Sequence, residues 1–258
     1  MGVTNLFKRA HILVREKGWG VFIARVWKRI FRPFERPFFF LCSPLAIMWV
    51  KWFGREMEAE KLLRFSERLF LGIIRPIQIR LEILGFLRMV QKERPRTVLE
   101  IGTDRGGVLF LLTKLSAPNA TLISLDLPAA RGGYANWRRL LYRSFASPSQ
   151  RMHFLKYDSH DPAALHAVSK ILAGRTLDLL FIDGDHTYEG VKKDFLMYSP
   201  LVKNGGLVAF HDVAYHPFAG PDCEVEKFWN EIKGKYEHVE LIEDKDQGWG
   251  GIGVLSLK

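Results

Sequence analysis

The stretch from Thr97 to Pro128, TVLEIGTDRGGVLFLLTKLSAPNATLISLDLP, decides the fold of this chain. Its first five residues are apolar and rich in β-branched side chains, which is typical of a strand buried in a parallel sheet. A glycine turn follows, then an apolar helix over residues 108–115 and a second strand over residues 121–127, with Asp126 at its carboxyl end. This order of elements predicts an α/β fold with a mostly parallel sheet and helices on both faces.

The glycine turn indicates which kind of ligand the sheet binds. Gly102, Gly106 and Gly107 would let a ligand approach the backbone without meeting a Cβ atom. A dinucleotide site would need a glycine where Asp104 stands, and the carboxylate of Asp104 would repel a pyrophosphate. The turn therefore suits a positively charged nucleoside without phosphate, and Asp126 is placed to bind ribose hydroxyls.

Ionisable side chains follow the fourth and fifth predicted strands, which cover residues 179–182 and 207–210, the latter after a predicted turn at 204–206. In a doubly wound sheet the fourth strand lies between the first and the fifth, so their carboxyl ends share one rim. The side chains expected there are Glu100, Asp183, His186, His211 and Asp212. Their close approach costs desolvation and mutual repulsion unless a cation or substrate uses them.

Three phrases of the sequence, VLEIGTDRGG, FIDGDHTYEGVKKDF and NGGLVAFHDV, resemble a known family. They are similar to the class I S-adenosylmethionine (SAM) methyltransferases that are grouped with cephalosporin hydroxylase-like and macrocin O-methyltransferase-like proteins. The resemblance covers residues 75–258 and implies a Rossmann-like sheet that ends in an antiparallel hairpin of residues 239–242 and 252–257. It also implies that an acid after the third strand contacts the adenine amino group. The cofactor-binding candidates are Glu100, Gly102, Thr103, Gly106, Gly107, Asp126, Asp158 and Asp185.

The resemblance also implies a metal site. Related metal-dependent O-methyltransferases hold a divalent cation with an Asp after the fourth strand and an acid–amide pair after the fifth. Asp183 matches the first ligand, whereas His211 stands in place of the acid and Asp212 in place of the amide. Magnesium or manganese is expected at this site, and a histidine ligand beside two carboxylates would also suit iron or zinc.

The mechanism that follows needs a base for the substrate hydroxyl. His186 or His211 is the candidate base, since both titrate near neutral pH in an ordinary environment. Asp183 would orient the hydroxyl together with the cation. Asp185 has two readings, because it could serve the cofactor site or cap the helix that starts near Thr187.

Residues 1–74 form a separate basic and aromatic segment that is expected to be helical. The net charge of +10 comes from the N-terminal part of the chain, because residues 1–96 carry +12 and the remainder −2. Residues 37–50, PFFFLCSPLAIMWV, are uncharged but shorter than the roughly 20 residues of a membrane span, and Pro44 is expected to break them. Packing on the catalytic domain or a second subunit, and membrane-surface contact through residues 1–55, both fit this pattern. Nucleic acid is disfavoured, because the basic residues alternate with bulky aliphatic ones.

Helices are also expected at residues 6–14, 21–31, 56–70, 78–92 and 225–233, with Glu82 off the apolar face of the fourth. The loop of residues 215–222 is a candidate substrate lid.

The sequence thus predicts a SAM-dependent O-methyltransferase that modifies a hydroxyl of a small molecule, such as a sugar or a lipid-linked glycan. A metal-dependent hydroxylase of the same group and a non-catalytic membrane-associated scaffold are the alternatives. Two distant cysteines and an N-terminus without a signal-peptide pattern predict a cytoplasmic location, at the inner face of the membrane if residues 1–55 bind it. A homo-oligomer is a further open possibility.

Overall fold

The computed structural model describes residues 37, 39–52, 57–69, 72–216, 223–244 and 246–257. The chain divides into two units, Met1–Leu45 and Ala46–Lys258, and the second contains the sheet. The helices predicted at residues 6–14 and 21–31 lie outside the described residues.

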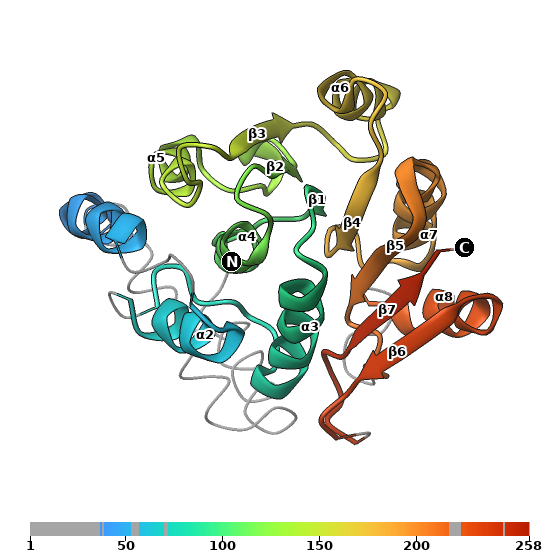
Figure 1. The fold of residues 1–258 in the computed structure, drawn as a ribbon. Coiled ribbons are helices and arrows are strands. Elements are labelled where there is room, and N and C mark those ends of the chain that lie inside the picture. The colour runs from blue at the N-terminus through green and yellow to red at the C-terminus, as the bar shows by residue number, and fades with distance from the viewer. Residues whose placement is uncertain are drawn as a thin grey trace, which may run out of the picture. The chain divides into compact units, whose positions relative to one another are not determined.

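Seven strands form one mixed sheet in the order β3-β2-β1-β4-β5-β7-β6 (Figure 1). The first five strands are parallel, β7 is antiparallel to β5, and β6 is antiparallel to β7. The predicted parallel sheet with a C-terminal antiparallel hairpin is confirmed. The strands are β1 (Thr97–Ile101), β2 (Thr121–Asp126), β3 (Arg151–Lys156), β4 (Leu177–Ile182), β5 (Val202–His211), β6 (Glu237–Leu241) and β7 (Ile252–Ser256).

Helices cover both faces of this sheet. Figure 1 shows α3 and α4 on one face and α6, α7 and α8 on the other. The α-helices are α2 (Ala59–Arg68), α3 (Arg80–Glu93), α4 (Gly107–Leu115), α5 (Arg139–Arg143), α6 (Pro162–Leu172), α7 (Tyr188–Tyr198) and α8 (Val225–Ile232). Short 3-10 turns occupy Ala129–Arg131, Asn136–Arg138, Ser199–Leu201 and Lys233–Lys235. Residues 39–52 are also helical.

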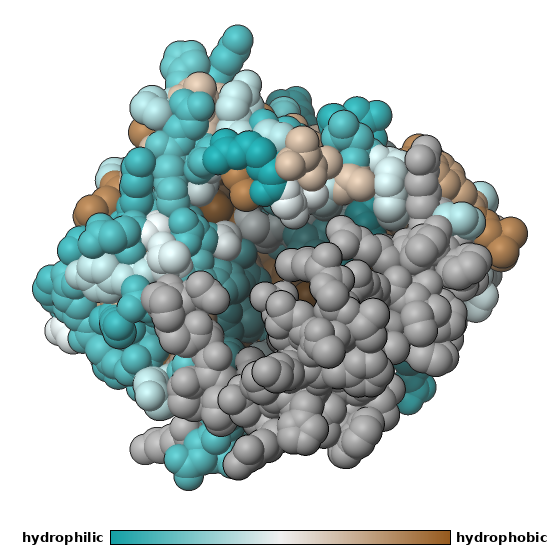
Figure 2. Space-filling model, turned by 180° about the vertical axis from the view of Figure 1, so that it is seen from behind, coloured by the Kyte–Doolittle hydropathy of each residue, from teal (hydrophilic) through white to brown (hydrophobic). Residues whose placement is uncertain are grey.

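The core is strongly apolar on the α6–α8 side, where Phe195, Phe210, Phe228 and Trp229 pack against one another. Burying such large side chains stabilises the fold by about 1.5–3 kcal/mol each. The face seen in Figure 2 is mostly hydrophilic where it is coloured, and the hydrophobic colour falls in separate patches.

Two local predictions were wrong. Residues 204–206 belong to β5 instead of forming a turn. Their backbone pairs with Leu257, the residue that follows β7: Gly205 N donates to Leu257 O, and Leu257 N donates to Gly206 O at 3.0 Å. The helix of residues 39–52 continues through Pro44. A proline there leaves the carbonyl of Phe40 without its usual donor, and Ser43 Oγ donates to that carbonyl at 3.4 Å.

Candidate functional site

A cavity of about 820 Å³ runs along the carboxyl ends of the parallel strands. Residues that follow β1, β2, β3, β4 and β5 line it, together with Gln78 before α3 and Trp249 from the β6–β7 loop. Its position is the one expected for a ligand site in an open α/β sheet, and its volume suits a ligand of nucleoside size.

Glu100 of β1 occupies the floor of this cavity and is fully buried. One carboxyl oxygen accepts a hydrogen bond from Thr103 Oγ1 at 2.7 Å, and that hydroxyl lies 2.8 Å from Ser124 Oγ. The other oxygen, Oε1, has no hydrogen-bond partner among the described residues. Burial raises the pKa of Glu100 well above its ordinary value. Glu100 therefore has one polar atom left for a ligand.

Two further acids stand at the ends of the next strands. Asp126 lies at the carboxyl end of β2, and its Oδ2 accepts from Thr103 N at 3.2 Å. Burial raises the pKa of Asp126, although Lys156 opposes that effect. Asp158 follows β3 and accepts from His160 N at 3.0 Å and Arg131 Nη2 at 2.9 Å, and these bonds lower its pKa. Both acids line the cavity.

The glycines of the turn make room for the protein itself. Gly102 has φ +84°, and a Cβ there would lie 1.9 Å from the carbonyl oxygen of Asp183. A Cβ at Gly106 would come within 2.5 Å of the Tyr142 ring, and one at Gly107 within 2.5 Å of Pro76 N. Gly102 and Gly107 line the cavity, whereas Gly106 lies under Tyr142 and is not part of the lining.

The predicted group of acids and histidines does converge at one rim. Asp183 follows β4, and its Oδ1 lies 3.1 Å from His211 Nδ1 and 3.3 Å from His186 Nε2. Asp212 Oδ2 lies 3.1 Å from His186 Nδ1 and 3.3 Å from His211 Nδ1. Two imidazoles therefore bridge two carboxylates.

The backbone at the end of β5 contributes to this convergence. Asp212 has a left-handed conformation with φ +63°, which is uncommon outside glycine but tolerated by Asp. Its second oxygen accepts from Gly250 N at 3.1 Å. The carboxylate of Asp212 is thus held from the β6–β7 loop on one side and from the imidazoles on the other.

The charges of this cluster stabilise one another. Hydrogen bonds to Asp183 and Asp212 raise the pKa of His186 to about 12. Burial opposes the charged form of His211, but the two carboxylates outweigh it and raise its pKa to about 10. Burial raises the pKa values of Asp183 and Asp212, yet the imidazoles hold both below the ordinary value. The imidazolium groups supply the positive charge that the acids require.

The same donors fit a divalent cation. Ligand atoms of Asp183, His211 and Asp212 lie within 4.8 Å of one another. His211 Nε2 is buried and lacks a hydrogen-bond partner in the part of the chain that the structure describes. Carboxylate oxygens with imidazole nitrogen suit manganese, iron or zinc, and magnesium through the oxygens.

Asp185 is not the cap of α7. Thr187 has that role, because its Oγ1 accepts from Gly190 N at 3.1 Å. Asp185 Oδ1 instead accepts from both Thr187 N and Thr187 Oγ1, at 2.9 and 2.8 Å. Asp185 lines the cavity, so its position agrees with the cofactor reading.

Sequence reasoning missed two residues that organise the site. Gln78 Nε2 donates to Asp183 Oδ2 at 2.8 Å. Glu82 of α3, expected off the apolar face, is buried and accepts from Glu243 N, Gln247 Nε2 and Gly251 N at 3.1, 2.6 and 2.8 Å. Helical periodicity carries no signal for either role, because the partners are remote in sequence.

The predicted lid at residues 215–222 lies mostly outside the described residues. Its first two residues, Tyr215 and His216, are described, and His216 lines the cavity.

The family model of a methyltransferase domain matches residues 99–213, the part of the chain that runs from β1 to just beyond β5. An uncharacterized protein of Acanthamoeba polyphaga mimivirus is 31% identical over 138 residues, which make up 54% of this chain and 61% of that protein. The chain thus spans about three fifths of the length of that relative.

Several solved structures are similar. An O-methyltransferase from Bacillus cereus in complex with SAH matches with a TM-score of 0.50 and 18% identity, over 77% of this chain and 90% of that one. The O-methyltransferase TomG from Streptomyces achromogenes, in complex with SAM, matches with a TM-score of 0.51 and 17% identity, over 83% of this chain and 96% of that one. MycE of the mycinamycin pathway, in complex with Mg, SAH and mycinamycin VI, matches with a TM-score of 0.51 and 19% identity, over 79% of this chain and 55% of that one.

These identities are low, so the likeness to the solved structures concerns the fold. It agrees with the strand order, with the antiparallel C-terminal hairpin and with the match of the family model to residues 99–213. Residues 99–213 are therefore similar to a methyltransferase domain, and the fold of the chain is that of the class I SAM-dependent methyltransferases, as its motifs predict.

Proposed function

We propose that the protein is a SAM-dependent O-methyltransferase that methylates a hydroxyl of a small molecule with the help of a divalent cation. One observation carries the proposal: the buried Glu100 and the acid–histidine cluster open into the same cavity. A cofactor held at β1 and β2 would thus lie beside the groups that activate a hydroxyl.

The cofactor end is assigned to the residues after β1, β2 and β3. Asp126 accepts hydrogen bonds from the ribose hydroxyls, and Asp158 accepts one from the adenine amino group. Glu100 offers Oε1, which has no partner among the described residues. The SAM methyl group is already activated by its sulfonium, so the work of the protein is to place the hydroxyl in line.

The acid–histidine end is assigned to proton removal. A bound divalent cation would lower the pKa of a coordinated hydroxyl. Asp183 and Asp212 would hold that cation, with His211 as third ligand or as base and His186 as the other candidate base. The two carboxylates keep both imidazoles protonated in the absence of a cation, so either role requires that the cation supplies the positive charge in place of the imidazole proton. Gln78 keeps the Asp183 carboxylate in its orientation through the bond to Oδ2.

Isothermal titration of SAM into the purified protein, with and without Mg²⁺ or Mn²⁺, tests the proposal. We expect micromolar binding that Asp126→Ala abolishes, and methyl transfer to a hydroxyl substrate that needs the cation. The matched control is Asp161→Ala, which removes an acid that only caps α6, through Asp161 Oδ1 and Ala163 N. Absence of SAM binding in every condition would refute the assignment.

A second candidate is a metal-dependent hydroxylase. The observation that favours it is the donor set itself, because two imidazoles beside carboxylates suit non-haem iron better than magnesium. Iron content of the purified protein together with a lack of SAM binding would favour this alternative. A scaffold that retains the fold would show no turnover, and no SAM binding unless it had kept the cofactor.

The part played by residues 1–55 is also a proposal. No helix among the described residues is long and apolar enough to cross a membrane. The helix of residues 39–52 nevertheless exposes several large apolar side chains at a spacing of three or four: Leu41, Leu45, Met48, Trp49 and Trp52. Such a stripe is typical of contact with a lipid surface or with another protein, including a second copy.

Flotation with anionic vesicles and measurement of the oligomeric state separate these two readings. We propose a cytoplasmic location at the inner membrane face, where lipid-linked glycan precursors are accessible. Flotation that Trp49→Ala and Trp52→Ala reduce would support membrane contact, and a stable dimer without flotation would support packing between copies.

A further inference from the structure

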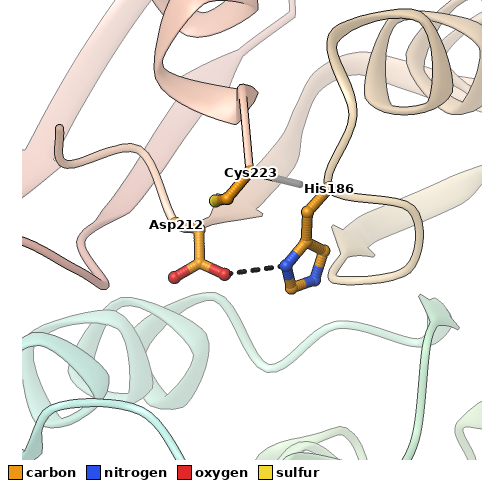
Figure 3. Close-up of side chains that lie close together, drawn as sticks. All are labelled: His186, Asp212 and Cys223. Atoms are coloured by element: carbon orange, nitrogen blue, oxygen red, sulfur yellow. Dashed lines mark ion pairs between the residues drawn. The ribbon is translucent and has the colours of Figure 1, made fainter. Parts of the chain in front are cut away.

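A third side chain lies beside the acid–histidine cluster and takes no part in the proposed function. His186 follows β4, Asp212 follows β5 and Cys223 precedes α8, and their ligand atoms lie within 4.8 Å of one another. Figure 3 shows the thiol of Cys223 close to the ion pair between His186 Nδ1 and Asp212 Oδ2, which are 3.1 Å apart.

The backbone fixes Cys223 in this place. The next residue, Glu224, donates its N–H to the carbonyl oxygen of His186 at 2.7 Å. Helix α8 begins directly afterwards and buries Val225, Phe228 and Trp229 in the core. The thiol is therefore anchored on one side by the loop after β4 and on the other by a packed helix.

The donor set of these three residues differs from that of a magnesium site. Imidazole nitrogen, carboxylate oxygen and cysteine sulfur together are ligands of zinc and other thiophilic cations, whereas magnesium prefers oxygen. In a tetrahedral zinc site, bonds of about 2.0–2.3 Å place ligand atoms about 3.5 Å apart. His186 Nδ1 and Asp212 Oδ2 are 3.1 Å apart, and all three ligand atoms lie within 4.8 Å of one another, which is close to this spacing.

We propose that His186, Asp212 and Cys223 hold a thiophilic divalent cation of the zinc class, with the Cys223 thiolate as a ligand. His186 and Asp212 line the large cavity, so the remaining coordination position is open to water or to a substrate oxygen. This inference rests on the proposed function in one respect, since Asp212 is shared. It goes beyond that function by naming Cys223 and by making His186 a ligand instead of a candidate base.

Cobalt(II) is the probe that tests this site, because a thiolate ligand gives cobalt a charge-transfer band in the near ultraviolet that oxygen and nitrogen ligands do not give. The full chain, kept reduced with a phosphine, is titrated with Co²⁺ and then with Zn²⁺ as competitor. We expect the band in the wild-type protein and its loss in Cys223→Ser. We also expect Zn²⁺ affinity to fall by about 100-fold, since removal of even an outer-shell partner costs about 10–100-fold.

The matched control is Cys42→Ser, which removes the other cysteine, in the helix of residues 39–52, and should leave the band unchanged. SAM titration of Cys223→Ser checks that the fold is intact. Cobalt bound without the band, or no cobalt bound, would overturn the inference. A band that disappears with Cys42→Ser would also overturn it. The proposed methyltransferase function is judged separately by SAM binding to the wild-type protein.

Discussion

Replacement of Glu82 by alanine tests the link between helix α3 and the β6–β7 loop. Glu82 is only 2% exposed, and its carboxylate accepts three hydrogen bonds from that loop, two from backbone N–H groups and one from the Gln247 amide. The alanine variant would leave these three donors without their acceptor.

The expected cost follows from this contact list. A hydrogen bond to a charged group contributes about 1.5–3 kcal/mol, and a donor that water can reach recovers part of its loss. Gln247 belongs to a partly exposed loop and can be solvated, so the two backbone donors dominate. We expect a loss of about 3 kcal/mol, which for a domain of this size lowers Tm by about 6–12 °C. Glu82→Gln keeps one acceptor oxygen and should cost about half as much.

The assay is thermal unfolding followed by circular dichroism, with Glu93→Gln as the control. Glu93 ends the same helix, is exposed and takes part in none of these bonds. The loop also holds Asp212 through Gly250 N, so Mn²⁺ binding at a temperature well below Tm should weaken in Glu82→Ala. A Tm equal to that of the Glu93→Gln control would refute the reasoning, because the loop would then not depend on this carboxylate.

Further predictions concern the floor and the rim of the cavity. Gly102→Ala would place a Cβ 1.9 Å from the Asp183 carbonyl oxygen at φ +84°, so we expect a large drop in Tm or insoluble protein, and a normal melting curve would contradict this packing. Asp183→Asn keeps the shape of the side chain but removes a carboxylate that faces two imidazolium groups, so we expect a loss of about 3–5 kcal/mol and a Tm lower by about 6–20 °C. Methyl transfer should fall by about 100-fold or more; full activity would remove Asp183 from the site. Glu100→Gln should raise Tm at pH 8 relative to wild type but not at pH 4, and should weaken SAM binding. The sign follows from its pKa, which folding raises: the protonated carboxyl is favoured in the folded state, so the wild-type protein loses stability as pH rises above the unfolded pKa of about 4.5. An equal Tm difference at both pH values would show that Glu100 is not held protonated by burial.

The main lines of the fold could be predicted from the sequence because they depend on local pattern. The apolar runs of β1, β2 and β4 are buried as expected. The meeting of Asp183 with His211 also followed from sequence, since the strand order of a doubly wound sheet places their strands side by side.

Other features were beyond reach because they depend on contacts between distant segments. Glu82 looks like a polar residue on a helix surface, and its partners lie more than 160 positions away. The glycines of the turn suggest space for a ligand, whereas the structure fills that space at Gly106 with Tyr142. Cys223 shows no metal spacing in the sequence, and it reaches His186 through the backbone bond of Glu224.

The late position of β7 in the chain has a consequence for biosynthesis. β7 inserts between β5 and β6, and the segment just before it supplies Gly250 N to Asp212 and Gly251 N to Glu82. A ribosome delivers the acids long before it delivers the amides that orient them, since synthesis proceeds from the N-terminus. In the nascent protein the carboxylates of Glu82 and Asp212 therefore precede the amides that orient them, and these hydrogen bonds can form only after the segment before β7 has been synthesised.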